Sequence, residues 1–180
     1  LLPLPALAGG LPASAVGVAA ATVVSPVAVR QLTDLDFGVV AANAGSGGEV
    51  VLAPGSGSAT YGGGARRGCS GGVACPAPHA ASFEVSGEAG RAYSIAAPDS
   101  IAVAGEAAAA GSGGSGGASP PVLRVEDLVF RSRSRPEAGS SGRLDAAGRD
   151  RFDLGGTLRV PAALPPARYR VSVPVIVAYS

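Results

Sequence analysis

Few side chains in this sequence are suited to catalysis. His79 is the only histidine, and all 14 basic residues are arginine. The absence of lysine excludes a Walker-type phosphate loop, a Schiff base and a Lys–Asn isopeptide crosslink. No G-x-S-x-G nucleophile motif occurs. Carboxylate pairs such as Asp34 and Asp36 fall on strand or turn positions, with nothing to indicate that they converge in one cleft. We therefore predict that the protein is not an enzyme and uses no cofactor.

The two cysteines, Cys69 and Cys75, lie close together in a glycine-rich stretch. A close pair in a β-rich chain without a catalytic context most often closes a small disulfide loop in an oxidising compartment. With His79 the pair also reads C-x5-C-x3-H, which is a partial zinc motif. An obvious fourth ligand and the regular spacing of zinc sites are missing. We predict the disulfide.

The charged residues indicate no polyanionic partner. The formal net charge is +1, which favours neither nucleic acid nor an anionic membrane. Arg131, Arg133 and Arg135 alternate with serines, as in a basic stripe for nucleic acid or acidic polysaccharide, but also as in a solvated strand edge that discourages unwanted pairing. We expect the second, and predict no nucleic-acid partner. Three aspartates within residues 145–153 match no compact calcium cage, so we predict no metal site.

The elements that position these side chains are β-strands. The 28 glycines and 15 prolines indicate many turns, and outside the alanine-rich stretches no window keeps a helical apolar period. The class is all-β, and 180 residues suit one domain. The clearest hairpin joins residues 81–86 and 91–96 through a turn at 87–90. Further strands are expected at residues 27–32, 35–40, 49–53, 101–104, 122–130 and 152–160, and residues 105–121 are a low-complexity loop.

Residues 168–180 have the strongest strand pattern. Successive side chains of a strand point to opposite faces, and the apolar residues here fall largely on one parity. Pro174 cannot donate to a ladder, which favours an edge position or a bulge. The sequence therefore predicts a long strand whose apolar face comprises Tyr169, Val171, Val173, Val175, Val177 and Tyr179.

The beginning of the sequence allows two readings. Residues 1–15 are apolar and close with A-S-A, like the end of a secretory signal peptide; alternatively they are retained as an extended arm. Either reading places the protein outside the cytoplasm. The run is too short and too rich in proline for a transmembrane helix, so we predict no membrane insertion.

The next stretch, residues 15–26, alternates in the manner of a strand. Its apolar parity is formed by Val16, Val18, Ala20, Thr22 and Val24. These residues are either the first strand of the protein's own sandwich or a detached strand that inserts into another subunit.

Five pieces of the sequence carry a family resemblance in a fixed order. They are LTDLDFG (residues 32–38), AASFEVSG (80–87), RAYSI (91–95), LGGTLRV (154–160) and ARYRVSVPVIVAY (167–179). The ordered set resembles the secreted bacterial family known as domain of unknown function 4402. The last piece also resembles the end of chaperone–usher pilins, whose last strand alternates apolar residues and closes with a penultimate tyrosine, here Tyr179.

The resemblance implies an immunoglobulin-like antiparallel β-sandwich, pilin-like and incomplete, that lacks one strand. An open groove beside an apolar strand leaves core side chains and backbone groups without partners. A donated strand satisfies both by β-augmentation. If that strand comes from the next identical subunit, the contact does not close and a filament results.

We therefore predict a structural subunit of an extracellular bacterial pilus-like filament, assembled by donor-strand exchange. Residues 1–26 would form the donor arm and residues 27–180 the sandwich domain. The apolar parity of residues 168–180 would be the acceptor strand, captured by a periplasmic chaperone and delivered to an outer-membrane usher before assembly. The alternative is a monomeric secreted surface adhesin or ligand-binding module, whose first strand completes its own sandwich and whose loops bind the ligand.

Overall fold

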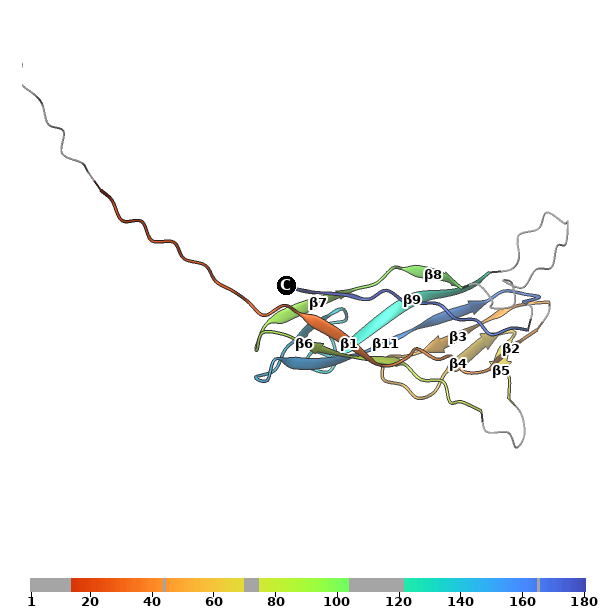
Figure 1. Ribbon diagram of the computed structural model, residues 1–180. Helices are drawn as coiled ribbons and strands as arrows, with labels where there is room; N and C mark the ends of the chain where they lie inside the picture. Colours follow the sequence, from red (N-terminus) through yellow and green to blue (C-terminus); the bar gives the residue numbers. More distant parts are fainter. Residues whose placement is uncertain (1–13, 44, 70–74, 104–121, 165) are drawn as a thin grey trace, which may run out of the picture.

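The computed structural model describes residues 14–43, 45–69, 75–103, 122–164 and 166–180 (Figure 1). This part of the chain contains strands and no helix, so the all-β, antiparallel class is confirmed; the donated strand stays a prediction. None of it forms an apolar helix of membrane-spanning length. The strands are β1 (Ala28–Thr33), β2 (Val40–Ala42), β3 (Gly48–Leu52), β4 (Thr60–Gly63), β5 (Ala65–Arg67), β6 (Ala81–Ser86), β7 (Ala92–Ala96), β8 (Ser100–Val103), β9 (Leu123–Ser132), β10 (Ser141–Arg143), β11 (Arg149–Val160) and β12 (Ile176–Tyr179).

The largest sheet is built around β11. One edge of β11 pairs with β9, and β9 pairs in turn with β8. The other edge pairs first with β6, through Leu154, and then with β3, from Gly156 onward. β1 extends the sheet beyond β6, and β4 extends it beyond β3. A single long strand therefore holds seven strands in one antiparallel sheet.

Gly155 lies where β11 changes its partner from β6 to β3. A Cβ placed on this residue would lie 2.1 Å from the carbonyl oxygen of Leu52 and 2.7 Å from the nitrogen of Pro54. Such a contact is far inside van der Waals distance, so only glycine allows the end of β3 to approach β11 this closely. The glycine pair that interrupts the apolar pattern of this strand is thus required by the sheet topology.

A second sheet, of β10, β7 and β12, packs against the first. The core between them draws on β6, β7 and β11 and is centred on Phe83, Tyr93 and Phe152. The rings of Phe83 and Phe152 stack with centroids 4.9 Å apart. A smaller core cluster, which includes Val50, Val125 and Leu158, lies toward the two-stranded sheet of β2 and β5. The architecture is a two-layer antiparallel sandwich.

The hairpin predicted for residues 81–86 and 91–96 is wrong. Both segments are strands, but β6 pairs with β1 and β11, whereas β7 pairs with β10 and β12. Residues 87–90 carry the chain across the core from one sheet to the other. Val85 and Tyr93 consequently face each other through the interior instead of lying side by side on one face. The alternation of apolar residues identifies both strands. The same alternation occurs whether the two strands pair in a hairpin or lie in different sheets joined by an arch, so it does not distinguish these arrangements.

Two further strand predictions need correction. Of residues 35–40, only Val40 belongs to a strand, because β2 begins there; residues 35–39 follow an irregular path. The strand predicted over residues 168–180 is shorter than expected, since the ladder of β12 begins only at Ile176. Strands β4 and β5 had no clear apolar alternation and were not predicted.

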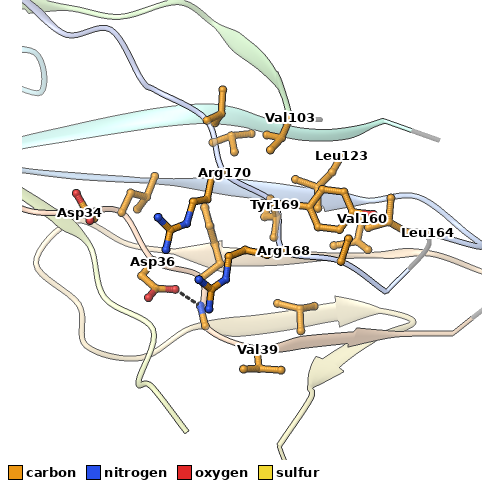
Figure 2. A pocket seen from close by; sticks show the side chains of 18 of the residues that line it. Asp34, Asp36, Val39, Val103, Leu123, Val160, Leu164, Arg168, Tyr169 and Arg170 are labelled. Atoms are coloured by element: carbon orange, nitrogen blue, oxygen red, sulfur yellow. Dashed lines mark hydrogen bonds between the residues drawn. The ribbon is translucent and has the colours of Figure 1, made fainter. Parts of the chain in front are cut away.

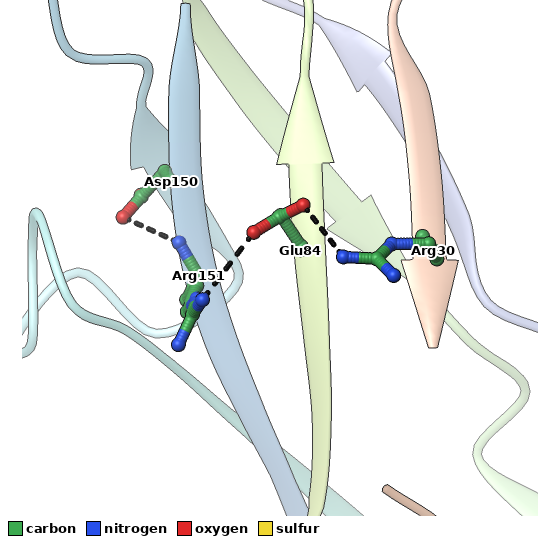
Figure 3. A network of polar contacts seen from close by, with 4 residues as sticks. All are labelled: Arg30, Glu84, Asp150 and Arg151. Carbon is green, nitrogen blue, oxygen red and sulfur yellow. Dashed lines mark hydrogen bonds and ion pairs between the residues drawn. The ribbon is translucent and has the colours of Figure 1, made fainter. Parts of the chain in front are cut away.

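A polar network covers the outer face of the large sheet, where Glu84 lies between two arginines (Figure 3). Its carboxylate accepts hydrogen bonds from Arg30 at 3.1 Å and from Arg151 at 3.5 Å. The hydrogen bond from Arg30 holds the pKa of Glu84 below its ordinary value of 4.5, and the charges of Arg151 and Arg149 act in the same direction.

Asp150 connects the sheets on the inner side. It accepts hydrogen bonds from the buried hydroxyl of Tyr93 at 2.9 Å, from Ser132 at 2.8 Å and from Ser134. Burial raises the pKa of Tyr93 above its ordinary value, and the carboxylate of Asp150 adds to the rise. Asp150 therefore has a structural role.

Candidate functional site

An open groove of about 1310 Å³ lies against the inner face of the large sheet. Two stretches of chain border it, residues 34–43 on one side and residues 163–164 and 166–173 on the other. Figure 2 views the groove from close by, with Asp36 and Val39 from the first border and Tyr169 and Arg170 from the second. The sandwich is therefore incompletely closed between these two borders.

The floor of the groove is the hydrophobic core itself. Eight of its lining residues are buried core side chains from β6, β8, β9 and β11: Ala81, Phe83, Val103, Leu123, Val125, Leu154, Leu158 and Val160. These floor side chains are at most 8% exposed, so the apolar surface open to water lies mainly at the borders, on Val39 and Val171. Covering such surface gains about 25 cal/mol per Å² removed from water. The groove thus reaches down to the core, and its exposed apolar surface lies at its borders.

One border of the groove has backbone groups free for pairing. Residues 171–175 belong to no strand, and no backbone hydrogen bond within the described residues involves them. Val171 is 40% exposed beside the groove. An apolar segment with free N–H and C=O groups is a template for an added strand.

The opposite border is held in place from its outer side. Asp36 and His79 exchange backbone hydrogen bonds at 2.8 and 2.9 Å, and the N–H of Gly38 donates to the carboxylate of Asp36 at 2.7 Å. Val39, which is 45% exposed, lines the groove, and its carbonyl accepts a hydrogen bond from Gly68. This border is therefore fixed by contacts that leave its groove side open.

The six residues predicted as the acceptor strand divide between the groove and the core. Tyr169, Val171 and Val173 line the groove. Val173, Val175, Val177 and Tyr179 pack against the main core, and Tyr169 packs against the smaller cluster. β12 pairs with β7, with Tyr179 opposite Tyr93. The first half of the stretch thus borders the opening, and the second half closes the sandwich.

The five residues predicted as donor lie outside the sandwich. Residues 14–26, called the arm below, are exposed throughout and form no strand; Val16 and Val18 are 98% and 95% exposed. Figure 1 shows the arm leading away from the body. The structure does not place Val16, Val18, Ala20, Thr22 and Val24 in the first strand of their own sandwich. The signal-peptide reading of residues 1–15 falls almost entirely outside the described residues.

Charged side chains stand at the groove but not on the arm. Asp34, Asp36, Arg168 and Arg170 all line the groove, and Figure 2 shows the two aspartates and the two arginines beside it. The arm contains no ionisable side chain. An uncharged extended segment could therefore enter the groove without bringing a charge onto the apolar floor, where an unpaired charge would be costly.

The predicted disulfide between Cys69 and Cys75 is confirmed. Both sulfurs are bonded to each other, so neither is a thiolate ligand and the zinc reading is excluded. Within the described residues no group of three or more His, Cys, Asp or Glu side chains is placed to hold a metal ion. The disulfide has a position that sequence reasoning missed: Gly68 bonds to the groove border at Val39, and Pro76 lines the groove. The disulfide therefore flanks the groove.

A comparison with family models matches residues 27–179 to a domain of unknown function, DUF4402. The matched segment begins directly after the arm and includes both borders of the groove. No curated protein and no solved structure matches the chain.

Proposed function

The chain belongs to the DUF4402 family, and on that premise we propose that it is a structural, non-catalytic subunit that polymerises by donating its arm to the groove of the next copy. The observation that carries the proposal is that one chain has both a groove that could receive a strand and an unpaired segment that could fill such a groove. A groove reaches the core, and its border at residues 171–173 has backbone groups without a hydrogen-bond partner among the described residues. An apolar segment with strand alternation extends into solvent.

The dimensions of the two features agree. A strand rises about 3.3 Å per residue, so residues 16–24 span about 30 Å and the bordering residues 166–173 span about 26 Å. Val16, Val18, Ala20, Thr22 and Val24 would point to the floor, and the residues between them would face solvent. Their backbone would pair with the backbone groups of residues 171–173, as in β-augmentation.

The proposed contact is directional. The arm of one copy enters the groove of another, whose own arm stays free for a third. Such a heterologous contact does not close on itself and produces a filament. A subunit of this kind needs protection of its groove before assembly, which supports a role for a periplasmic chaperone and an outer-membrane usher. The disulfide supports assembly in an oxidising compartment outside the cytoplasm.

The test uses two charge substitutions that differ only in the face they occupy. Val18→Asp places a carboxylate on the face that would enter the groove, whereas Ala19→Asp places it on the opposite face. We expect the wild type and Ala19→Asp to form filaments in electron micrographs, and Val18→Asp to form none. Deletion of residues 1–24 should also abolish filaments.

A matching pair tests the groove. Val171→Asp changes a side chain that lines the groove, and Ala178→Asp changes an exposed residue of β12 that does not line it. Only the first should prevent assembly. Filaments from Val18→Asp or from the deletion variant would refute the proposal. A wild-type chain that stays monomeric at all concentrations in light scattering would instead favour the secreted adhesin.

A further inference from the structure

The arm is attached to the body through a contact that sequence reasoning did not anticipate. The hydroxyl of Tyr179 donates a hydrogen bond to the carbonyl of Ser25 at 2.8 Å and accepts one from the backbone N–H of Glu88 at 2.7 Å. A phenolic hydroxyl has one proton to donate, and that proton is committed to the root of the arm. The Tyr179–Ser25 hydrogen bond is called the root contact below.

The ring of Tyr179 is held in one place by its surroundings. The guanidinium carbon of Arg91 lies 4.8 Å from the ring centroid, within the range of a cation–π interaction. On another side, a Cβ on Gly87 would lie 2.2 Å from the hydroxyl oxygen and 3.1 Å from the adjoining ring carbon. Because Gly87 has no side chain, the hydroxyl end of the Tyr179 ring can occupy this space. The position of the hydroxyl is consequently fixed relative to the sandwich.

The chain on both sides of Ser25 favours one direction. Pro26 follows, and a residue before proline is restricted to extended conformations. Val27 then packs against the main core, and β1 begins at Ala28. Reversal of the arm at Ser25 would have to rotate the carbonyl that Tyr179 holds. The root contact and Pro26 therefore both oppose a turn back toward the body.

Such a turn is what insertion into the arm's own groove requires. Val173, which lines the groove, lies six residues before Tyr179, or about 20 Å along an extended chain. The arm is long enough to cover this distance, because residues 14–25 span about 40 Å when extended. Length alone therefore does not prevent a molecule from filling its own groove.

We propose that Tyr179 is a positioning residue for assembly: through the root contact it directs the arm away from its own groove, so that the recipient is a second copy of the chain. This inference rests on the proposed function, since it presumes that the arm fits the groove. It adds that the choice between the molecule's own groove and a neighbour's is made at the root of the arm.

The experiment measures the direction of the arm inside one molecule. Spin labels are attached in the full-length chain to Ala19→Cys, on the arm face that would point away from the floor, and to Ser172→Cys at the groove border. The labelled chain is diluted into excess unlabelled chain of the same variant, so that short distances arise only within one molecule. Wild type and Tyr61→Phe, whose hydroxyl forms no hydrogen bond within the described residues, should give long distances.

Tyr179→Phe removes the root contact but keeps the ring, and Gly87→Ala displaces the ring but keeps the hydroxyl. Loss of one neutral hydrogen bond shifts an equilibrium by about two- to tenfold. Both variants should therefore raise the short-distance population by that factor, and their filaments should be correspondingly fewer. Distance distributions that coincide with those of wild type would overturn the inference.

A second measurement separates this inference from the proposed function. A synthetic peptide of residues 14–24, which lacks Ser25, is added to the full-length Val18→Asp chain with and without Tyr179→Phe. We expect equal affinities, because the free peptide needs no root contact. If the peptide binds neither chain, the arm is not the occupant of the groove and the proposed function fails. If it binds both chains and the distances are unchanged, only the role of Tyr179 fails.

Discussion

Titration of Glu84 should make the stability of the fold depend on pH. Its carboxylate is paired with Arg30 and Arg151 on the outer face of the large sheet, and the folded state lowers its pKa below 4.5. A carboxyl group whose pKa is lower in the folded state stabilises that state above its unfolded pKa. This contribution is lost as the pH falls from about 4.5 through the folded pKa.

We therefore expect Glu84→Gln to lower the melting temperature slightly at pH 7 and to have less effect at pH 3. The effect is small because Arg30 is largely exposed and water screens the pair. Differential scanning calorimetry of wild type and variant across this range is the measurement. Glu137→Gln is the control, since Glu137 forms no ion pair within the described residues. A melting difference for Glu84→Gln that is equal at pH 7 and pH 3 would contradict the prediction.

Among the contacts of individual residues, the sequence indicated some and not others. The bond between Cys69 and Cys75 could be predicted because two cysteines close together have few alternatives. The bond between Tyr179 and Ser25 could not, because the partner is a backbone carbonyl that any residue would supply. The penultimate tyrosine was recognised from the alternation of the last strand, but alternation does not indicate where its hydroxyl group would bind.

The loop closed by the disulfide is the element that should most affect both stability and the groove. In the chain-entropy description, a loop this short stabilises the fold by about 2–3 kcal/mol. The double variant Cys69→Ser with Cys75→Ser should lower the free energy of unfolding by that amount in urea titrations. Its affinity for the arm peptide should fall as well, because next to the two cysteines Gly68 donates a hydrogen bond to Val39 at the groove border and Pro76 lines the groove.

Wild-type protein treated with a reductant serves as the control, and should match the double variant in both measurements. Equal urea midpoints for wild type and variant would contradict the stabilising role. Loss of stability with full peptide affinity would show that the loop does not shape the groove.

Strands with strong alternation were the elements that the sequence indicated best. β1, β3, β6, β7, β9 and β11 all lie within a few residues of their predicted ranges. The pairing of β6 was not predictable in the same way, because its partners β1 and β11 are set by which sheet each strand joins. The irregular borders of the groove were missed for a related reason. Residues 35–39 carry apolar side chains at strand spacing, yet their backbone bonds go to His79 and Gly68 instead of a regular ladder.

For the whole molecule, occupation of the groove should raise thermal stability. A ligand that binds only the folded state adds about 2.7 kcal/mol at 100 times its dissociation constant, which corresponds to roughly 5–10 °C for a domain of this size. We expect this shift when the peptide of residues 14–24 is added to the full-length Val18→Asp chain. The same peptide carrying Val18→Asp is the control and should leave the melting temperature unchanged. Equal shifts with both peptides would mean that binding does not depend on the apolar face.

The all-β class could be anticipated from alternation and composition, whereas alternation alone left residues 15–26 open between a first strand and a detached strand. The location of the groove could not, because its floor joins side chains from β6, β8, β9 and β11, which are far apart in the sequence. Only the three-dimensional arrangement brings the backbone of residues 171–173 beside those side chains.

The central position of β11 has a consequence for how the protein is made. The strands that pair with β11, namely β3, β6 and β9, all precede it in the chain. Leu52 of β3, for example, can pair with β11 only once Gly156 has been synthesised. When the chain is synthesised or exported from its N-terminus, these strands have unpaired edges until β11, which ends at residue 160, has emerged. Contacts of such long sequence separation form slowly, and unpaired edges aggregate in the meantime. The newly made chain is therefore prone to aggregate for a time that grows with the separation in sequence between β3 and β11.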